Sequence, residues 1–318
     1  LKSIPERTQQ IEFLNSTQAP AVAFTQSKTV VYLYFEEVKS NQVDGVVGLN
    51  TEENGEVSFT GDFQLRLLNV LKKGEEFEIR WRRPGKEVQS LDLGFEIPYL
   101  FKTPFWLESE VSIFRQDSSF VNTTVTGLLK YLLESGSFVS GGVTYRSSNV
   151  LQQGNQGFAD FGSFKTLFYK LGVELKKTNR VIIPTKGYIL KTYGLTGKRE
   201  SEGGSQRQYG WQGHGDRYFT VAPRHILKTG LGSEAIFGEN LCQNELYRIG
   251  GLKTLRGFNE QSIFSSAYAI GTPEYRYMIG EYDYLTAFAD VAYSETNTES
   301  MFASNIFTGL GTGLNFRT

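Results

Sequence analysis

The segment Gly250 to Phe258 (GGLKTLRGF) places one arginine among apolar residues and glycines, within a long polar connection between two strand-like segments. The tip of this segment is Leu255, Arg256, Gly257 and Phe258. An arginine withdrawn from water needs carboxylate partners, which its planar guanidinium can bind with two parallel hydrogen bonds. Glu274 and Asp290 follow downstream. We therefore expect the connection, about residues 239–266, to fold inward so that Arg256 pairs with both acids.

Three glycines near the end of the chain fit the same interpretation. Gly309, Gly311 and Gly313 alternate with larger residues, so they share one face of a strand. A wall without side chains admits the close approach of another backbone, and we expect these glycines to face the loop. The same alternation places Glu274 and Asp290 on the inner face of their strands. The alternative is that each acid is an ordinary solvated carboxylate.

Other residues that often carry chemistry are few. The chain has two histidines, His214 and His225, and one cysteine, Cys242. None of them lies at a spacing typical of metal ligands, and we expect His214 in a glycine-rich external loop and His225 beside a short turn. The run Gly309–Gly313 resembles a phosphate-binding loop, but no helix follows it. The sequence predicts no enzyme, no metal and no cofactor.

The elements that position these residues are strands. From Gln42 onward apolar and polar residues alternate, as in 57–67 (VSFTGDFQLRL), although the mean hydropathy is only -0.31. Alternation of this kind is typical of a transmembrane β-barrel, and also of a soluble sandwich. Aromatic residues near strand ends favour an all-β, antiparallel barrel over residues 41–318, with about fourteen strands. Its lipid-facing side would carry Phe59, Phe63, Leu65, Trp81, Phe95, Leu171 and Leu314. Its interior would carry Asp62, Arg66, Glu96 and Glu174.

The connections alternate between short and long. Short ones such as 133–138 would be periplasmic turns, and long ones such as 196–216 (TGKRESEGGSQRQYGWQGHGD) external loops. Residues 1–40 differ in texture, with a possible short helix over 4–14 and a hairpin formed by 19–26 and 28–38. This region is too short to fold alone and is expected to be the end of a small α+β module.

In order along the chain, the LRGF tip, a Glu-x-Arg strand (Glu274, Arg276), a Phe-x-Asp strand (Phe288, Asp290) and the strand GLGTGLNF resemble the outer-membrane protein assembly family of BamA and TamA. Upstream segments such as LLNVLKKGEEFEIRW are similar to members from Bacteroidetes-type bacteria. The resemblance implies that residues 1–40 are the C-terminal part of a POTRA module. It also implies a barrel of about sixteen strands, two of them after Thr318.

The resemblance implies a location in the bacterial outer membrane and a role in folding and inserting other β-barrel proteins. The working part would be the seam between the last strand and the first, Gln42 to Asn50, which is expected to be short and weakly paired. The seam residues are Val43, Asp44, Gly45, Val46, Val47, Gly48 and Leu49. Expected partners are unfolded outer-membrane proteins, accessory lipoproteins or periplasmic chaperones, and outer-membrane lipid, but no nucleic acid. A polypeptide transporter of the two-partner secretion type is the alternative, and the arginine loop disfavours a passive porin.

Overall fold

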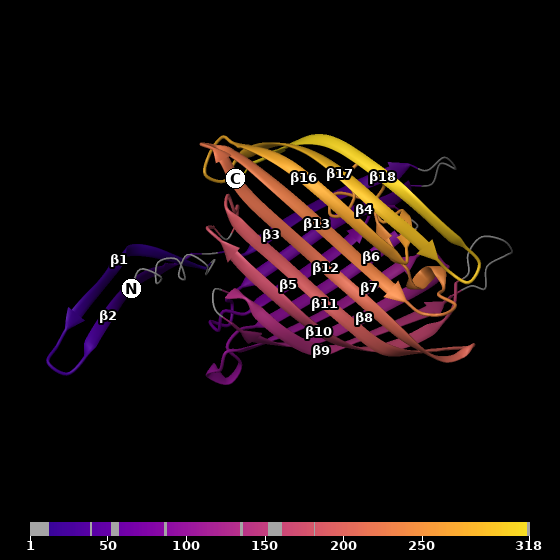
Figure 1. Cartoon of the computed structure of the whole chain (residues 1–318), viewed down its shortest axis with the longest axis horizontal. Helices are drawn as coiled ribbons and strands as arrows, with labels where there is room; N and C mark the ends of the chain where they lie inside the picture. Colours follow the sequence, from indigo (N-terminus) through magenta and orange to yellow (C-terminus); the bar gives the residue numbers. More distant parts are fainter. Residues whose placement is uncertain are drawn as a thin grey trace.

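The computed structural model is built almost entirely from antiparallel strands (Figure 1). It describes residues 13–38, 40–51, 57–85, 88–133, 136–151, 161–180 and 182–316. Fourteen strands form one sheet that curves into a barrel, and a separate hairpin lies outside one end of it. In the described part of the chain, no helix is both long and apolar enough to cross a membrane.

The hairpin consists of β1 (Leu14–Phe24) and β2 (Thr29–Glu37). The first half of the barrel comprises β3 (Gln42–Thr51), β4 (Val57–Leu68), β5 (Glu76–Arg83), β6 (Val88–Ile97), β7 (Phe105–Gln116), β8 (Phe120–Leu132) and β9 (Phe138–Val150), with the short 3-10 helix η1 (Leu100–Lys102) before β7. The second half comprises β10 (Phe164–Thr178), β11 (Gly187–Ser201), β12 (Gly204–Ala222), β13 (His225–Phe237), β16 (Ala267–Met278), β17 (Tyr284–Asn297) and β18 (Phe302–Asn315).

Strands adjacent in the chain are neighbours in the sheet, which runs from β3 to β18. The one exception is the step from β13 to β16, which contains a long loop. The predicted count of about fourteen strands is confirmed. The hairpin connects to the barrel next to the turn between β4 and β5, where Asn69 donates a hydrogen bond to Glu37 (3.2 Å).

The two faces of the sheet follow the predicted alternation. Phe63 pairs across strands with Trp81, and Leu171 is 71% exposed on the outside of β10. On the opposite face, Arg66 forms an ion pair with Glu76 (2.7 Å), and Lys130 lies between Glu96, Glu108 and Glu174. Charges that pair in this way belong to the interior, since an unpaired charge facing lipid is costly. Asp62 lies opposite Arg82 on this inner face.

Two expectations need correction, and a third concerns residues that the structure does not describe. The segment 196–216 is not a long loop, because β11 and β12 continue to a tight turn between Ser201 and Gly204. His214 therefore lies within β12. The first strand is not short, since β3 pairs with β4 along its full ten residues. The helix predicted over 4–14 lies almost wholly outside the described residues.

Candidate functional site: the loop between β13 and β16

The connection between β13 and β16 turns back into the barrel interior. It contains a 3-10 helix, η3 (Gln243–Glu245), and a small hairpin of β14 (Tyr247–Ile249) and β15 (Ile263–Ser265). Buried side chains of the loop contact inward-facing residues of the surrounding strands. The segment expected to fold inward, about 239–266, corresponds to this loop.

Arg256 at the loop tip lies between the two predicted acids. Its Nε and Nη2 donate to the two carboxylate oxygens of Asp290 (2.8 and 2.7 Å), and its Nη1 donates to Glu274 (3.2 Å). The backbone N–H of Arg256 also donates to Asp290 (3.0 Å). This is the bidentate geometry for which a guanidinium is suited, so the tip is held in both position and orientation.

The surroundings of the pair strengthen it. Asp290 and Glu274 are buried, and the guanidinium of Arg256 lies 3.4 Å from the ring centre of Phe288. Arg276 donates to the second oxygen of Glu274 (2.6 Å), so that carboxylate is shared by two arginines. Burial alone would lower the pKa of Arg256, but its hydrogen bonds to Asp290 and Glu274 outweigh burial and raise it. Arg256 therefore stays positively charged at neutral pH.

The apolar residues beside Arg256 form a small core inside the barrel. Leu255 is fully buried and packs with Ile249 of the loop and with Ile270 and Ala292 of the wall. The ring of Phe258 packs edge-on against Phe307 of β18, with 5.4 Å between centroids. The tip is thus fixed by apolar contacts on both sides of the ion pair.

Gly309 permits the close approach of the loop. A Cβ atom at this position would lie 2.0 Å from the carbonyl oxygen of Arg256, which no side chain could tolerate. Gly311 and Gly313 were also expected to face the loop, but their nearest neighbours are the side chains of Phe288 and Thr286 on β17. Gly311 instead leaves space for the Phe288 ring beneath Arg256.

A second anchor, which the sequence did not reveal, holds the start of the loop. The fully buried Glu245 forms an ion pair with Arg199 of β11 (2.5 Å) and accepts a hydrogen bond from Gln208 of β12 (2.7 Å). Its neighbour Asn244 is also fully buried and donates to Ser148 of β9 (2.6 Å). The loop is therefore fixed to the wall at Glu245 as well as at the LRGF tip.

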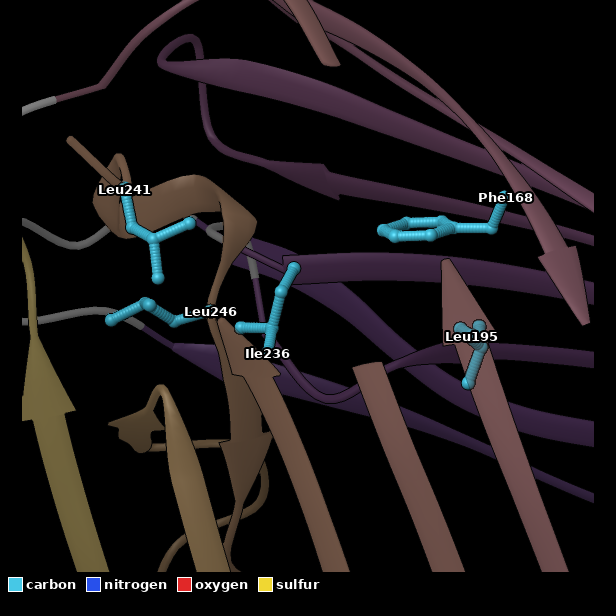
Figure 2. Packing of buried hydrophobic residues seen from close by; sticks show 5 residues of the cluster. All are labelled: Phe168, Leu195, Ile236, Leu241 and Leu246. Atoms are coloured by element: carbon cyan, nitrogen blue, oxygen red, sulfur yellow. The ribbon is translucent and has the colours of Figure 1, made fainter. Parts of the chain in front are cut away.

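Apolar contacts accompany this second anchor. Figure 2 shows Leu241 and Leu246 of the loop near Ile236, with Phe168 and Leu195 on neighbouring strands. All five belong to one buried cluster. The loop therefore contacts the inner wall through apolar residues as well as through ion pairs.

A third contact reaches the far wall. Glu260, which follows the tip, forms an ion pair with Arg82 of β5 (2.6 Å). Since Arg256 is held by β16 and β17, the loop contacts strands close to both ends of the sheet.

Of the remaining candidates, Cys242 belongs to the loop, whereas the two histidines lie apart from it on β12 and β13. Cys242 is half-buried, within 3.3 Å of a guanidinium nitrogen of Arg199, and His214 is near Asp216 (3.3 Å). His225 bonds to Tyr275. Among the described residues, no group of three or more histidine, cysteine or acidic side chains is placed to hold a metal ion. Strand β3, which carries the seam residues, is exposed along almost its whole length.

The fold and the loop define an outer-membrane β-barrel with an arginine-tipped loop inside it. Residues 69–318 match the family model described as the Omp85 superfamily domain, so the chain belongs to the Omp85 superfamily. A comparison with curated proteins finds no match.

Solved structures of similar fold include BamA from Haemophilus ducreyi lacking POTRA domains 1-3, with a TM-score of 0.56, 15% identity, and coverage of 92% of this chain and 64% of that one. CdiB from Acinetobacter baumannii has a TM-score of 0.60 and 12% identity, with coverage of 94% and 58%. CdiB from Escherichia coli has a TM-score of 0.63 and 16% identity, with coverage of 96% and 62%. The chain thus spans less than two thirds of the length of each.

Proposed function

We propose that this Omp85 protein folds and inserts other β-barrel proteins into the outer membrane, using the free edge of β3 as a template for an incoming strand. Its clients would be unfolded outer-membrane proteins, delivered with the help of periplasmic chaperones or accessory lipoproteins. The hairpin β1–β2 would be the end of a POTRA module. The task requires neither cofactor nor metal.

The observation that carries this proposal is the position of β3 at one end of the described sheet, where its ladder partner is β4. Val46 is 67% exposed even though it faces the interior, whereas exposure on the outer face is common to central strands, as Leu171 on β10 shows. None of the described loop contacts reaches β3. An edge strand held mainly by one ladder is the part of a sheet that opens most easily, and a bilayer drives its unpaired N–H and C=O groups to find another strand.

The occupied interior supports the same mechanism over passage through the barrel. The loop is anchored at Glu245, at Arg256 and at Glu260, on strands spread around the wall. A polypeptide crossing the interior would have to displace these contacts. Secretion of a partner polypeptide is the second candidate, because two of the similar structures are CdiB proteins.

Site-directed crosslinking distinguishes the two. In a Cys242→Ser background, Val43→Cys on β3 is compared with Leu171→Cys on β10, because both side chains face outward and both are 71% exposed. We expect a disulfide with a cysteine in the client's terminal strand at position 43 and none at 171. Equal crosslinking at both positions would contradict the seam mechanism. Crosslinks of a passing polypeptide to Thr124→Cys, which lines the interior, would favour the transporter.

A further inference from the structure

A cavity of about 410 Å³ lies between the loop and the wall formed by β7 to β13. Basic side chains from both sides line it, Arg146 from β9 and Arg248 from β14, together with Lys170 of β10. Two carboxylates, Glu110 and Glu234, line it as well.

Arg248 is the unmatched charge. Its guanidinium lies 3.3 Å from the ring centre of Phe114, and its Nη1 is buried without a hydrogen-bond partner. No hydrogen bond or ion pair joins this side chain to any residue in the described ranges. Burial, and after it the positive charge of Arg146, lower the pKa of Arg248 to about 9. At neutral pH the group is still a cation.

The nearby carboxylates do not compensate it. Glu234 accepts a hydrogen bond from Gln212 (3.3 Å), and the cations that act on it are Arg146 and Lys170. Arg146 in turn donates to the backbone carbonyl of Glu245 (2.9 Å). No carboxylate of the described chain contributes to the electrostatics of Arg248. A cation whose Nη1 is buried without a counter-charge is unfavourable, so the site calls for an anion.

We propose that this cavity binds a small anion, between chloride and inorganic phosphate in size, which is held by Arg248 and Arg146. Gln261 supplies a further polar group, since its side-chain oxygen is buried without a partner and a half-turn of the amide presents its N–H donors instead. The volume accommodates such an anion together with some of its water.

The anion would complete the docking of the loop. Arg248 and Gln261 belong to the loop, whereas Arg146 and Phe114 belong to the wall. An anion between them supplies a contact that the protein alone lacks. Such a ligand binds only when the loop is in place, so its binding stabilises the docked state by mass action.

Thermal unfolding of the whole purified protein in detergent tests this proposal. At constant ionic strength in sodium gluconate, stepwise replacement by inorganic phosphate should raise the Tm with a saturable dependence, and chloride is titrated in parallel. In Arg248→Gln the phosphate concentration at half-effect should rise about tenfold or more, because charge-assisted hydrogen bonds are lost. Lys198→Gln removes a positive charge from an exposed position outside the cavity, and its titration should match the wild type.

Two further variants keep the test decisive if Arg248→Gln does not fold. Arg248→Lys keeps the charge and should retain most of the shift, whereas Arg146→Gln should weaken it as Arg248→Gln does. The proposal is overturned if neither anion produces a saturable shift in the wild type. It is equally overturned if the Tm shift is the same in the wild type, in Arg248→Gln and in Arg146→Gln.

Discussion

The carboxylate of Asp290 accepts three hydrogen bonds from Arg256, two from the guanidinium and one from the backbone amide. One side chain of the wall thus fixes both the side chain and the main chain of the loop tip. A lysine could replace the charge of Arg256 but not this geometry.

Replacing Arg256 with alanine should release the loop tip, because Asp290 and Glu274 would then be buried without their partner. Loss of a buried pair costs about 3–5 kcal/mol, and the lower end applies here because the Arg256 side chain remains 18% exposed. Limited trypsin digestion should cut after Lys253 faster in Arg256→Ala than in the wild type, and Arg256→Lys should be intermediate. Equal cleavage in all three proteins would show that Arg256 does not hold the loop tip in place.

Gly309→Ala should displace the tip without removing any polar contact, because the new methyl group would meet the carbonyl oxygen of Arg256. Overpacking of this kind costs about 1–3 kcal/mol. Gly232→Ala on β13 is the matched control, since this glycine also faces the interior and a Cβ there meets nothing within 4 Å. Samples of each variant are heated to increasing temperatures and run on a gel beside an unheated sample. The temperature at which the compact, folded form disappears is then compared between the two variants. If both variants unfold at the same temperature, the close approach at Gly309 makes no contribution to stability.

Glu245→Ala should free the first half of the loop, since Arg199 would be left buried with its main partner gone. The expected cost is again about 3–5 kcal/mol, and Glu245→Gln should cost less because it keeps the hydrogen-bonding shape. The rate at which a maleimide modifies Cys242, three residues away, reports this change. A labelling rate in Glu245→Ala equal to that of the wild type would show that the second anchor is dispensable.

The thiol of Cys242 should react slowly at pH 8. Burial, and after it the negative charge of Glu245, raise its pKa from the ordinary 9.0 to about 11, so little thiolate is present. Because the unfolded thiol loses its proton at a lower pH than the folded one, the contribution of this group to stability is present below pH 9 and is lost between about 9 and 11. The labelling rate should therefore increase up to about pH 11. A rate that levels off near pH 9 would contradict this assignment.

The sequence predicted the barrel and the tip because both depend on local pattern. The alternation of apolar and polar residues places Leu171 on the outer face and Glu174 on the inner face of β10. The two acids that pair with Arg256, Glu274 and Asp290, lie on the two barrel strands that follow the loop in the chain. Only Gly309 among the three predicted glycines meets the loop, because a shared face does not reveal how far along the strand the loop reaches.

The second anchor could not be predicted in the same way. Arg199 and Gln208 lie in the segment that was expected to be a long external loop, with its many glycines and charges. In the structure both face inward on long strands, where Glu245 meets them. Glycine content indicated a loop, whereas the cross-strand pairing of β11 with β12 determined the structure.

The ion pair between Glu260 and Arg82 has a mechanical consequence. Strand β5 is the third from one end of the sheet and β17 the second from the other, and the loop is fastened to both. The loop therefore bridges the barrel interior between strands near the two ends of the sheet. A force that spreads the two end strands is resisted by side-chain contacts at Arg82 and Asp290, which can break singly and re-form, whereas a hydrogen-bonded ladder must be unzipped from one end.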